Sequence, residues 1–158
     1  MSWERSHRGT GFELGCDGPS SILVGVDGSE SSMRALAYAV GLARRQHSRL
    51  VAVYVRGFTA ALLAVSDRTG GVAEAHRQAQ DEIESELRTL FLRSCEWGVD
   101  AHLLVVDGDP LAKLSAVADE LRADAVLIGA SASLRHRLAG SLAVRLVRSR
   151  RWPVTVVP

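Results

Sequence analysis

The chain has 158 residues, of which 47% are hydrophobic and 23% are charged, close to the average for soluble globular domains. That composition excludes intrinsic disorder as the main state, and the length predicts one domain that folds without a metal or a disulfide. The 19 basic and 18 acidic side chains give a net charge of +1. Total charge therefore indicates neither nucleic acid nor a membrane as a partner.

The two cysteines, Cys16 and Cys95, lie far apart in the sequence and have no metal-ligand spacing. We interpret them as reduced thiols. No apolar run approaches the roughly 20 residues of a membrane span. The first residues also lack the apolar centre of a secretory signal. We expect a soluble, cytoplasmic protein.

Residues 1–20 carry four glycines and scattered charges without a period, and we interpret them as a flexible extension of a domain over 21–158. Short apolar runs rich in branched residues predict buried strands, and apolar residues at helical spacing predict helices. The predicted strands are 21–26, 50–55, 99–106, 123–131 with its exit loop, and 153–158. The first predicted helix ends at Arg45 and the second covers 72–95. The third begins at Pro110 and the fourth covers 140–151, while residues 57–71 are ambiguous.

Two helix starts have clear caps in the sequence. Ser29 or Ser31 can accept hydrogen bonds from the free amides of the first helix. Asp109 is the expected N-cap of the third helix, where Pro110 takes the first helical position.

Strands and helices alternate through the domain. This pattern predicts an α/β fold with a parallel sheet, helices on both faces and right-handed crossovers. In such sheets a ligand crevice lies beyond the carboxyl ends of the strands, where the strand order reverses. The loops that follow the first four strands are therefore the places to search for function.

Asp27 follows the first strand, and its carboxylate has two interpretations. It can accept hydrogen bonds from a ribose or a base, or it can only fix the turn before the helix. Asp107 to Pro110, after the third strand, is mostly a helix start.

The loop over 129–141 follows the fourth strand and contains glycine near both ends, three serines and the basic trio Arg135, His136 and Arg137. It leads into a helix N-terminus, where free amides and the helix dipole favour an anion. A phosphate site and a solvated basic loop both remain open.

Several chemistries lack their motifs. The sequence contains neither common Gly-rich phosphate loop and no G-x-S-x-G elbow of a serine hydrolase. The five histidines have no metal-ligand spacing, and no general base is paired with a nucleophile. We therefore assign no catalytic residue and no metal. A phosphoacceptor receiver domain is also disfavoured, because the chain has no lysine after its last strand.

Three stretches together resemble the universal stress protein family over about residues 21–158. They are VGVDGSESSMRALAYAVGLAR, then VVDGDPLAKLSAVADELRADAVLIGAS, then GSLAVRLVRSRRWPVTVVP. The resemblance implies a five-stranded parallel sheet of order 3-2-1-4-5, a Rossmann-like sandwich of the adenine nucleotide alpha hydrolase-like type. It also implies a cytoplasmic homodimer linked to survival under stress.

One branch of that family binds ATP and another does not. The ATP-binding branch carries G-x2-G-x9-G-S or G-T, and the corresponding residues here are Gly129, Ala132 and Gly140-Ser141. Alanine replaces the second glycine, and seven residues rather than nine precede Gly140. The resemblance assigns adenosine contacts to Val26, Asp27, Val53, Ile128 and Gly129, and it places Ala132, Gly140, Ser141 and Leu142 at the phosphate loop. The loop residues Arg135 and Arg137 are our own candidates for phosphate contacts.

Two functions follow from the resemblance. The first is a stress-response regulator that binds ATP or a related adenine nucleotide through this altered loop, with slow ATP hydrolysis at most. The alternative is a homodimeric interaction module of the same family that binds no nucleotide. In both, the partner is a second copy paired through the apolar edge strand 154–157, and an unidentified protein partner is expected. Neither involves nucleic acid or a membrane.

Overall fold

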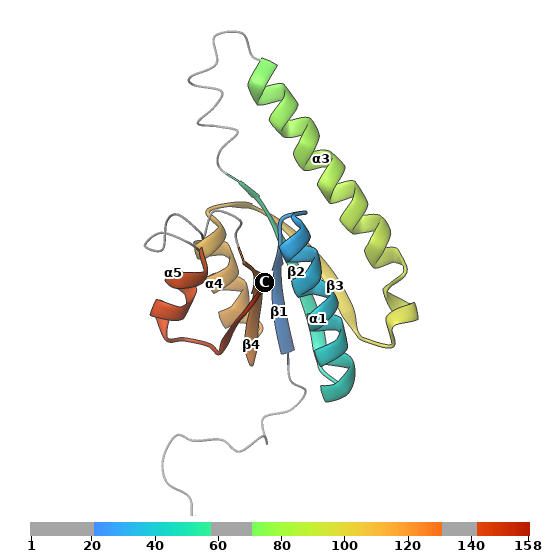
Figure 1. The fold of residues 1–158 in the computed structure, drawn as a ribbon, viewed down its shortest axis with the longest axis vertical. Helices are drawn as coiled ribbons and strands as arrows, with labels where there is room; N and C mark the ends of the chain where they lie inside the picture. Colours follow the sequence, from blue (N-terminus) through green and yellow to red (C-terminus); the bar gives the residue numbers. More distant parts are fainter. Residues whose placement is uncertain (1–20, 58–70, 131–141) are drawn as a thin grey trace, which may run out of the picture.

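A computed structural model describes residues 21–57, 71–130 and 142–158 (Figure 1). The expectations for 1–20, for most of the ambiguous segment 57–71 and for the loop 131–141 lie outside the described residues. The strands are β1 (Ser21–Val26), β2 (Arg49–Gly57), β3 (Ala101–Gly108), β4 (Ala125–Gly129) and β5 (Val154–Val157). The helices are α1 (Glu30–Gln46), α3 (Gly71–Leu92), the 3-10 turn η1 (Ser94–Trp97), α4 (Pro110–Glu120) and α5 (Leu142–Ser149).

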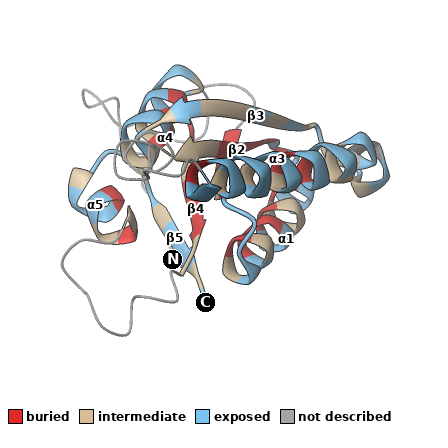
Figure 2. Ribbon diagram, turned by 90° about the horizontal axis from the view of Figure 1, so that it is seen from above, coloured by how far each residue is buried: buried red, intermediate tan, exposed pale blue. Residues whose placement is uncertain are grey.

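The five strands form one parallel sheet in the order β3-β2-β1-β4-β5, which confirms the predicted fold class and strand order. Gly25 of β1 lies level with Val53 of β2 on one side and Ile128 of β4 on the other. Helices α1 and α3 cover one face of the sheet, and α4 and α5 cover the other (Figure 2). Each face therefore has its own layer of core.

The continuous apolar runs of β1, β2 and β4 occupy the middle of the sheet. We expect two residues of each of these strands to be buried if the strands are central. All six are at most 6% exposed, which confirms that prediction: Val24, Val26, Val51, Val53, Val126 and Ile128. Side chains that alternate along each strand enter the two cores in turn. A strand buried on both faces needs apolar residues at every position, which explains these runs.

The outer strand β3 is less buried than its apolar sequence suggests. Its residues alternate between half-buried and exposed, and Leu104 is 38% exposed. Because β3 is at the edge of the sheet, it has a neighbouring strand on one side among the described residues. The buried character that the sequence indicates for the strands therefore does not extend to β3.

The helix starts agree with the sequence. Ser29 caps α1, its hydroxyl oxygen accepting from the amide of Ser32, and Asp109 caps α4, with Pro110 as its first residue. The long second helix ends earlier than predicted, at Leu92 instead of Cys95. Its first turns extend past the carboxyl ends of the strands (Figure 1).

Candidate functional site

The strand order reverses between β1 and β4, because the chain leaves β1 towards β2 and returns to β4 on the other side. The carboxyl ends of these two strands therefore form the predicted crevice. Four of the predicted site residues meet here: Val26 and Asp27 at the end of β1, and Ile128 and Gly129 at the end of β4. The fold thus brings together two segments that are about a hundred residues apart in the sequence.

Asp27 is held by the first turn of α1. Its Oδ1 accepts a hydrogen bond of 2.9 Å from the amide of Ser29, and its own amide donates to the hydroxyl of Ser32 at 3.3 Å. The Ser32 hydroxyl in turn donates to the carbonyl of Ser29 at 2.9 Å. This network fixes the carboxylate at the positive end of the α1 dipole.

The network also controls the charge of Asp27. Partial burial alone would raise the pKa of its carboxyl group, but the hydrogen bonds from Ser29 and Ser32 outweigh it and hold that pKa below its ordinary value. Asp27 is consequently an anion at neutral pH. Such a group accepts hydrogen bonds from hydroxyl or amino groups of a ligand.

Gly129 ends β4 in direct contact with the same turn of α1. A Cβ atom at this position would lie 2.5 Å from the carbonyl carbon of Ser31 and 2.5 Å from the amide nitrogen of Ser32. Real Cβ atoms do not approach backbone that closely, so only glycine allows β4 and α1 to meet here. This close backbone approach joins the end of β4 to the start of α1 at the strand-order reversal.

The remaining predicted site residues have different positions. Val53 lies in the middle of β2 with 0% of its surface exposed, inside the core that faces α4 and α5. Leu142 is the first residue of α5 and packs against the same core. Ala132, Arg135, Arg137, Gly140 and Ser141 lie outside the described residues. The structure therefore describes the strand ends of the predicted site but not its phosphate loop.

A cluster that sequence reasoning missed stands beside the crevice. Strand β2 extends three residues beyond the level of Val26, and its Arg56 reaches Glu84 of α3, with 2.8 Å between Nε and Oε2. Arg88 also donates to Glu84, at 2.7 Å. Glu84 is only 8% exposed. Its position next to Ile83 and Leu87 was the available signal.

These ion pairs attach α3 to the strand that borders the crevice. The pKa of Glu84 lies below its ordinary value, mainly because Arg56 donates a hydrogen bond to its carboxylate. Burial would raise this pKa, and the hydrogen bond from Arg88 lowers it further. The hydroxyl of Tyr54 adds a hydrogen bond of 3.3 Å to the carbonyl of Gln80. Burial raises the pKa of Tyr54, so its hydroxyl keeps its proton at neutral pH.

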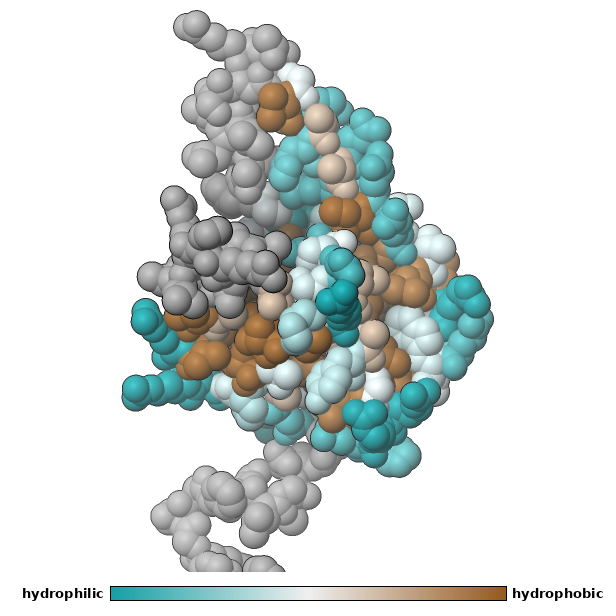
Figure 3. All heavy atoms as spheres, viewed as in Figure 1, coloured by the Kyte–Doolittle hydropathy of each residue, from teal (hydrophilic) through white to brown (hydrophobic). Residues whose placement is uncertain are grey.

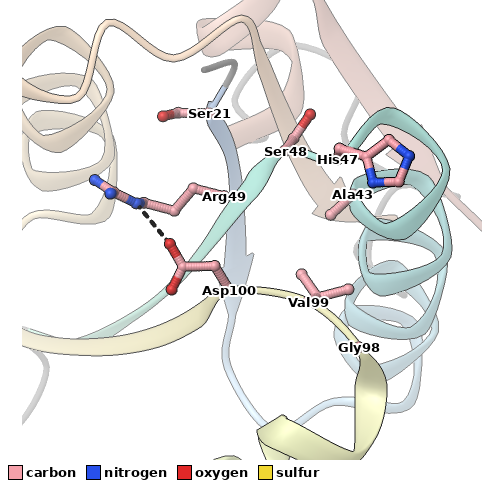
Figure 4. A pocket seen from close by; sticks show the side chains of 8 residues that line it. All are labelled: Ser21, Ala43, His47, Ser48, Arg49, Gly98, Val99 and Asp100. Carbon is pink, nitrogen blue, oxygen red and sulfur yellow. Dashed lines mark hydrogen bonds and ion pairs between the residues drawn. The ribbon is translucent and has the colours of Figure 1, made fainter.

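A separate pocket of about 280 Å³ lies at the opposite, amino-terminal end of the sheet. Its lining residues are Ser21, Ala43, His47, Ser48, Arg49, Gly98, Val99 and Asp100. Figure 4 shows Arg49 and Asp100 pointing toward one another along one side, with Nε and Oδ2 3.1 Å apart. None of the predicted site residues lines this pocket. Ligands of doubly wound sheets bind at the carboxyl ends, so the crevice is the stronger candidate.

Two further searches concern the described ranges 21–57, 71–130 and 142–158 only. They contain no group of three or more His, Cys, Asp or Glu side chains that could hold a metal ion. They also contain no helix that is both long and apolar enough to cross a membrane.

The parallel order β3-β2-β1-β4-β5, with paired helices on each face and a crevice at the β1–β4 reversal, defines the adenine nucleotide alpha hydrolase-like fold. Residues 20–158 match the universal stress protein family. The chain belongs to that family.

Individual relatives agree with this assignment. A universal stress protein of Methanocaldococcus jannaschii is 28% identical over 143 residues, covering 86% of this chain and 80% of the relative. A solved structure of a family protein from Burkholderia pseudomallei is 29% identical, with a TM-score of 0.62, and covers 88% of this chain and 96% of its own. A universal stress protein solved in complex with cAMP is 25% identical, with a TM-score of 0.56 and coverage of 88% and 96%.

Proposed function

We propose that this chain is a cytoplasmic stress-response protein that binds ATP or a related adenine nucleotide at the carboxyl ends of β1 and β4. The observation that carries the proposal is the junction of Asp27, Ser32 and Gly129. It holds an anionic acceptor beside a close contact between β4 and α1, at the place where the strand order reverses. The similar protein solved with cAMP supports an adenine nucleotide as the ligand.

The described residues suit the adenosine part of the nucleotide. The Asp27 carboxylate accepts hydrogen bonds, which suits ribose hydroxyls or an adenine amino group. Gly129 lets β4 end against the first turn of α1, which keeps the Asp27 carboxylate and the end of β4 close together. The phosphates would be held by Gly140, Ser141 and the guanidinium groups of Arg135 and Arg137, which form strong hydrogen bonds to phosphate oxygens. We expect slow ATP hydrolysis at most, because the described residues pair no nucleophile with a general base.

A second candidate function is a homodimeric interaction module without a nucleotide. The changed loop favours it: Ala132 stands where ATP-binding relatives carry glycine, and the stretch before Gly140 is two residues shorter. A left-handed backbone at Ala132 would cost about 1–2 kcal/mol, which corresponds to roughly tenfold in affinity.

Calorimetric titration with ATP, ADP and adenosine distinguishes the two candidates. We expect wild type to bind ATP, and the Asp27→Ala variant to bind it at least about tenfold more weakly, since it loses a charged hydrogen-bond acceptor. Asp109→Ala is the matched control, because Asp109 is another carboxylate that accepts from a backbone amide at a helix start, and this variant should bind ATP as wild type does. The absence of heat and of any thermal shift at millimolar ATP would leave the interaction module as the function.

The same titration tests the phosphate contacts. The double variant Arg135→Ala, Arg137→Ala should weaken ATP binding and leave adenosine binding unchanged. Equal ATP affinity of this variant and wild type would mean that the two arginines form only a solvated loop.

The proposed partner is a second copy of the chain, paired antiparallel through β5 about a two-fold axis. Strand β5 is the other edge of the sheet, and its Val156 is 38% exposed. An apolar edge strand favours pairing with another edge. In sedimentation at micromolar concentration we expect a dimer for wild type and a monomer for Val156→Lys. A monomeric wild type would contradict this pairing.

A further inference from the structure

The near-neutral total charge conceals an asymmetry along the chain. Residues 125–158 contain six of the 19 basic side chains, all of them arginine, and none of the 18 acidic ones. This segment therefore carries +6, and the 124 residues before it carry −5. Such an asymmetry between two parts of a chain is typical of proteins that bind a polyanion.

Four of these arginines lie together in the described residues, on α5 and the turn that follows it. We call Arg145, Arg148, Arg150 and Arg151 the α5 arginine surface. All four are exposed. Where Figure 1 places α5, Figure 3 shows hydrophilic side chains that project outward with apolar residues beside them. The surface belongs to the α4–α5 layer, and it runs away from the nucleotide crevice towards the amino end of the sheet.

The arginines of this surface are available to a partner. Arg145, Arg148 and Arg150 form no ion pair with any other residue that the structure describes. Arg151 is anchored by an ion pair to Asp119 of α4, and its guanidinium carbon lies 4.6 Å from the centre of the Trp152 ring. The C-terminal dipole of α5 accounts for a cation in its last turn, such as Arg148, but not for four.

We propose that the α5 arginine surface binds the phosphate backbone of nucleic acid without sequence specificity. Guanidinium groups bind phosphate oxygens through paired hydrogen bonds, and a helix fixed to the core presents them at constant spacing. This departs from the expectation drawn from total charge alone. Local charge density, and not the sum over the chain, determines contact with a polyanion.

An anionic membrane is the less suitable partner for this surface. A helix that lies in a membrane interface buries its apolar face in the lipid. In α5 that face is already used, because Ala143 is 7% and Leu146 is 0% exposed within the core. Val147, at 54% exposure, is the single large apolar residue of the helix that is well exposed. One valine gives little insertion energy, so phosphate contact without insertion is favoured.

The test measures binding of the full chain to a labelled random-sequence DNA duplex and to a labelled RNA strand by fluorescence anisotropy over a series of salt concentrations. For up to four phosphate contacts, we expect the logarithm of the association constant for the duplex to fall with the logarithm of the salt concentration, with a slope of about −3 to −4. The triple variant Arg145→Glu, Arg148→Glu, Arg150→Glu should bind the duplex at least about tenfold more weakly, and the magnitude of its salt slope should be smaller by about 3.

The matched control reverses three exposed arginines of α1, which lies on the other face of the sheet: Arg34→Glu, Arg44→Glu and Arg45→Glu. It changes the net charge of the chain equally. Nearly unchanged binding by this control, with loss in the α5 variant, supports the proposal. Equal loss in both variants would mean a general charge effect and overturn it.

Two other results would also overturn the proposal: no binding of either nucleic acid by wild type at low salt, or preferential binding to phosphatidylserine vesicles over the duplex. Should the charge reversals prevent folding, Arg145→Gln, Arg148→Gln, Arg150→Gln replaces them with the same expected loss. Asp27→Ala, at the other end of the sheet, should bind nucleic acid as wild type does. The nucleic-acid result is therefore independent of the nucleotide site.

Discussion

The two ends of the sheet are built from the same strands and helices, yet they are held together differently. At the carboxyl end, backbone meets backbone: Gly129 of β4 touches the first turn of α1, and Asp27 is fixed by amide and hydroxyl groups of that turn. At the amino end, side chains bridge an open pocket, as Arg49 and Asp100 do. The carboxyl end is therefore closely packed, while the amino end contains a pocket with exposed charged side chains.

The charges at the two ends of α1 follow its dipole. The helix N-termini lie at the carboxyl end of the sheet, where Asp27, Glu30 and Asp109 are found. The helix C-termini lie at the amino end, where α1 carries Arg44 and Arg45 in its last turn. Acids at N-termini and bases at C-termini are each favoured by the dipole. Helix α1 therefore has opposite charges at its two ends, whereas α4 ends in the acids Asp119 and Glu120.

The largest expected effect breaks the carboxyl end. Gly129→Ala places a Cβ atom 2.5 Å from two backbone atoms of α1 and 2.7 Å from the carbonyl oxygen of Ser31. Overpacking usually costs about 1–3 kcal/mol, and backbone neighbours yield less than side chains, so we expect a loss above about 3 kcal/mol. Thermal unfolding should show a melting temperature lower by roughly 6–12 °C or an insoluble protein.

Gly98→Ala is the matched change at the amino end. Gly98 lines the pocket, and a Cβ atom there would have no atom within 4 Å, but its φ of +64° is left-handed. We expect about 1–2 kcal/mol of destabilisation from the backbone conformation alone. A similar loss in both variants would show that the contact between β4 and α1 adjusts as easily as the open pocket.

The second effect concerns the ion pairs beside the crevice. Glu84→Ala removes a buried carboxylate that accepts from two arginines, while Arg56 can turn towards water because 36% of its side chain is exposed. We expect a loss of about 1–3 kcal/mol in the free energy of unfolding, measured with urea. Glu82→Ala, two residues earlier on the exposed side of α3, should change stability by less than about 0.5 kcal/mol.

Glu84 also gives the stability a definite pH dependence. Its pKa is lowered in the folded protein, so the folded state binds this proton less readily than the unfolded chain does. The stabilisation is complete above the ordinary pKa of glutamate and is lost as the pH falls through the folded value. Wild type should therefore lose more stability than Glu84→Gln on acidification from pH 7 to about pH 3, with most of the difference arising below the ordinary pKa of glutamate. Parallel curves for the two proteins would contradict the role of this carboxylate.

Much of the fold could be predicted from the sequence, because central parallel strands need apolar residues at every position and helix caps need specific side chains. The runs around Val24, Val53 and Ile128 and the caps Ser29 and Asp109 carried that information. The burial of β3 was predicted less well, since an apolar run does not show whether a strand lies in the middle of the sheet or at its edge.

The candidate site was only partly predictable for a related reason. Asp27 and Gly129 could be found because strand ends in a doubly wound sheet are known positions for ligands. The residues that hold the site in place could not be predicted. In the sequence, Ser32 is an ordinary serine of a first helical turn, and Glu84 is one acid among several on α3. Their roles depend on distances between segments that are remote in sequence, such as the contact between β4 and α1.

A third effect sharpens the description of the crevice. Ser32→Ala removes a hydroxyl that is buried with its residue, at 3% exposure, and that joins the Asp27 amide to the Ser29 carbonyl. We expect a loss of about 1–2 kcal/mol and an upward shift of the Asp27 pKa, followed by NMR titration of its carboxyl carbon. Ser31→Ala, at the neighbouring half-buried position, should leave that pKa unchanged.

The smallest effect is expected at the amino end, where Arg49 and Asp100 form an ion pair with side chains 50% and 59% exposed. The pKa of Asp100 lies below its ordinary value, mainly because Arg49 donates a hydrogen bond to its carboxylate. Burial would raise this pKa, and the hydrogen bond with His102 lowers it further. Because solvent screens this pair, Arg49→Gln should cost at most about 1 kcal/mol, and the cost should vanish in high salt. A double-mutant cycle with Asp100→Asn measures the pair directly. A coupling clearly above 1 kcal/mol would mean that side-chain pairing holds the amino end as firmly as backbone contact holds the carboxyl end.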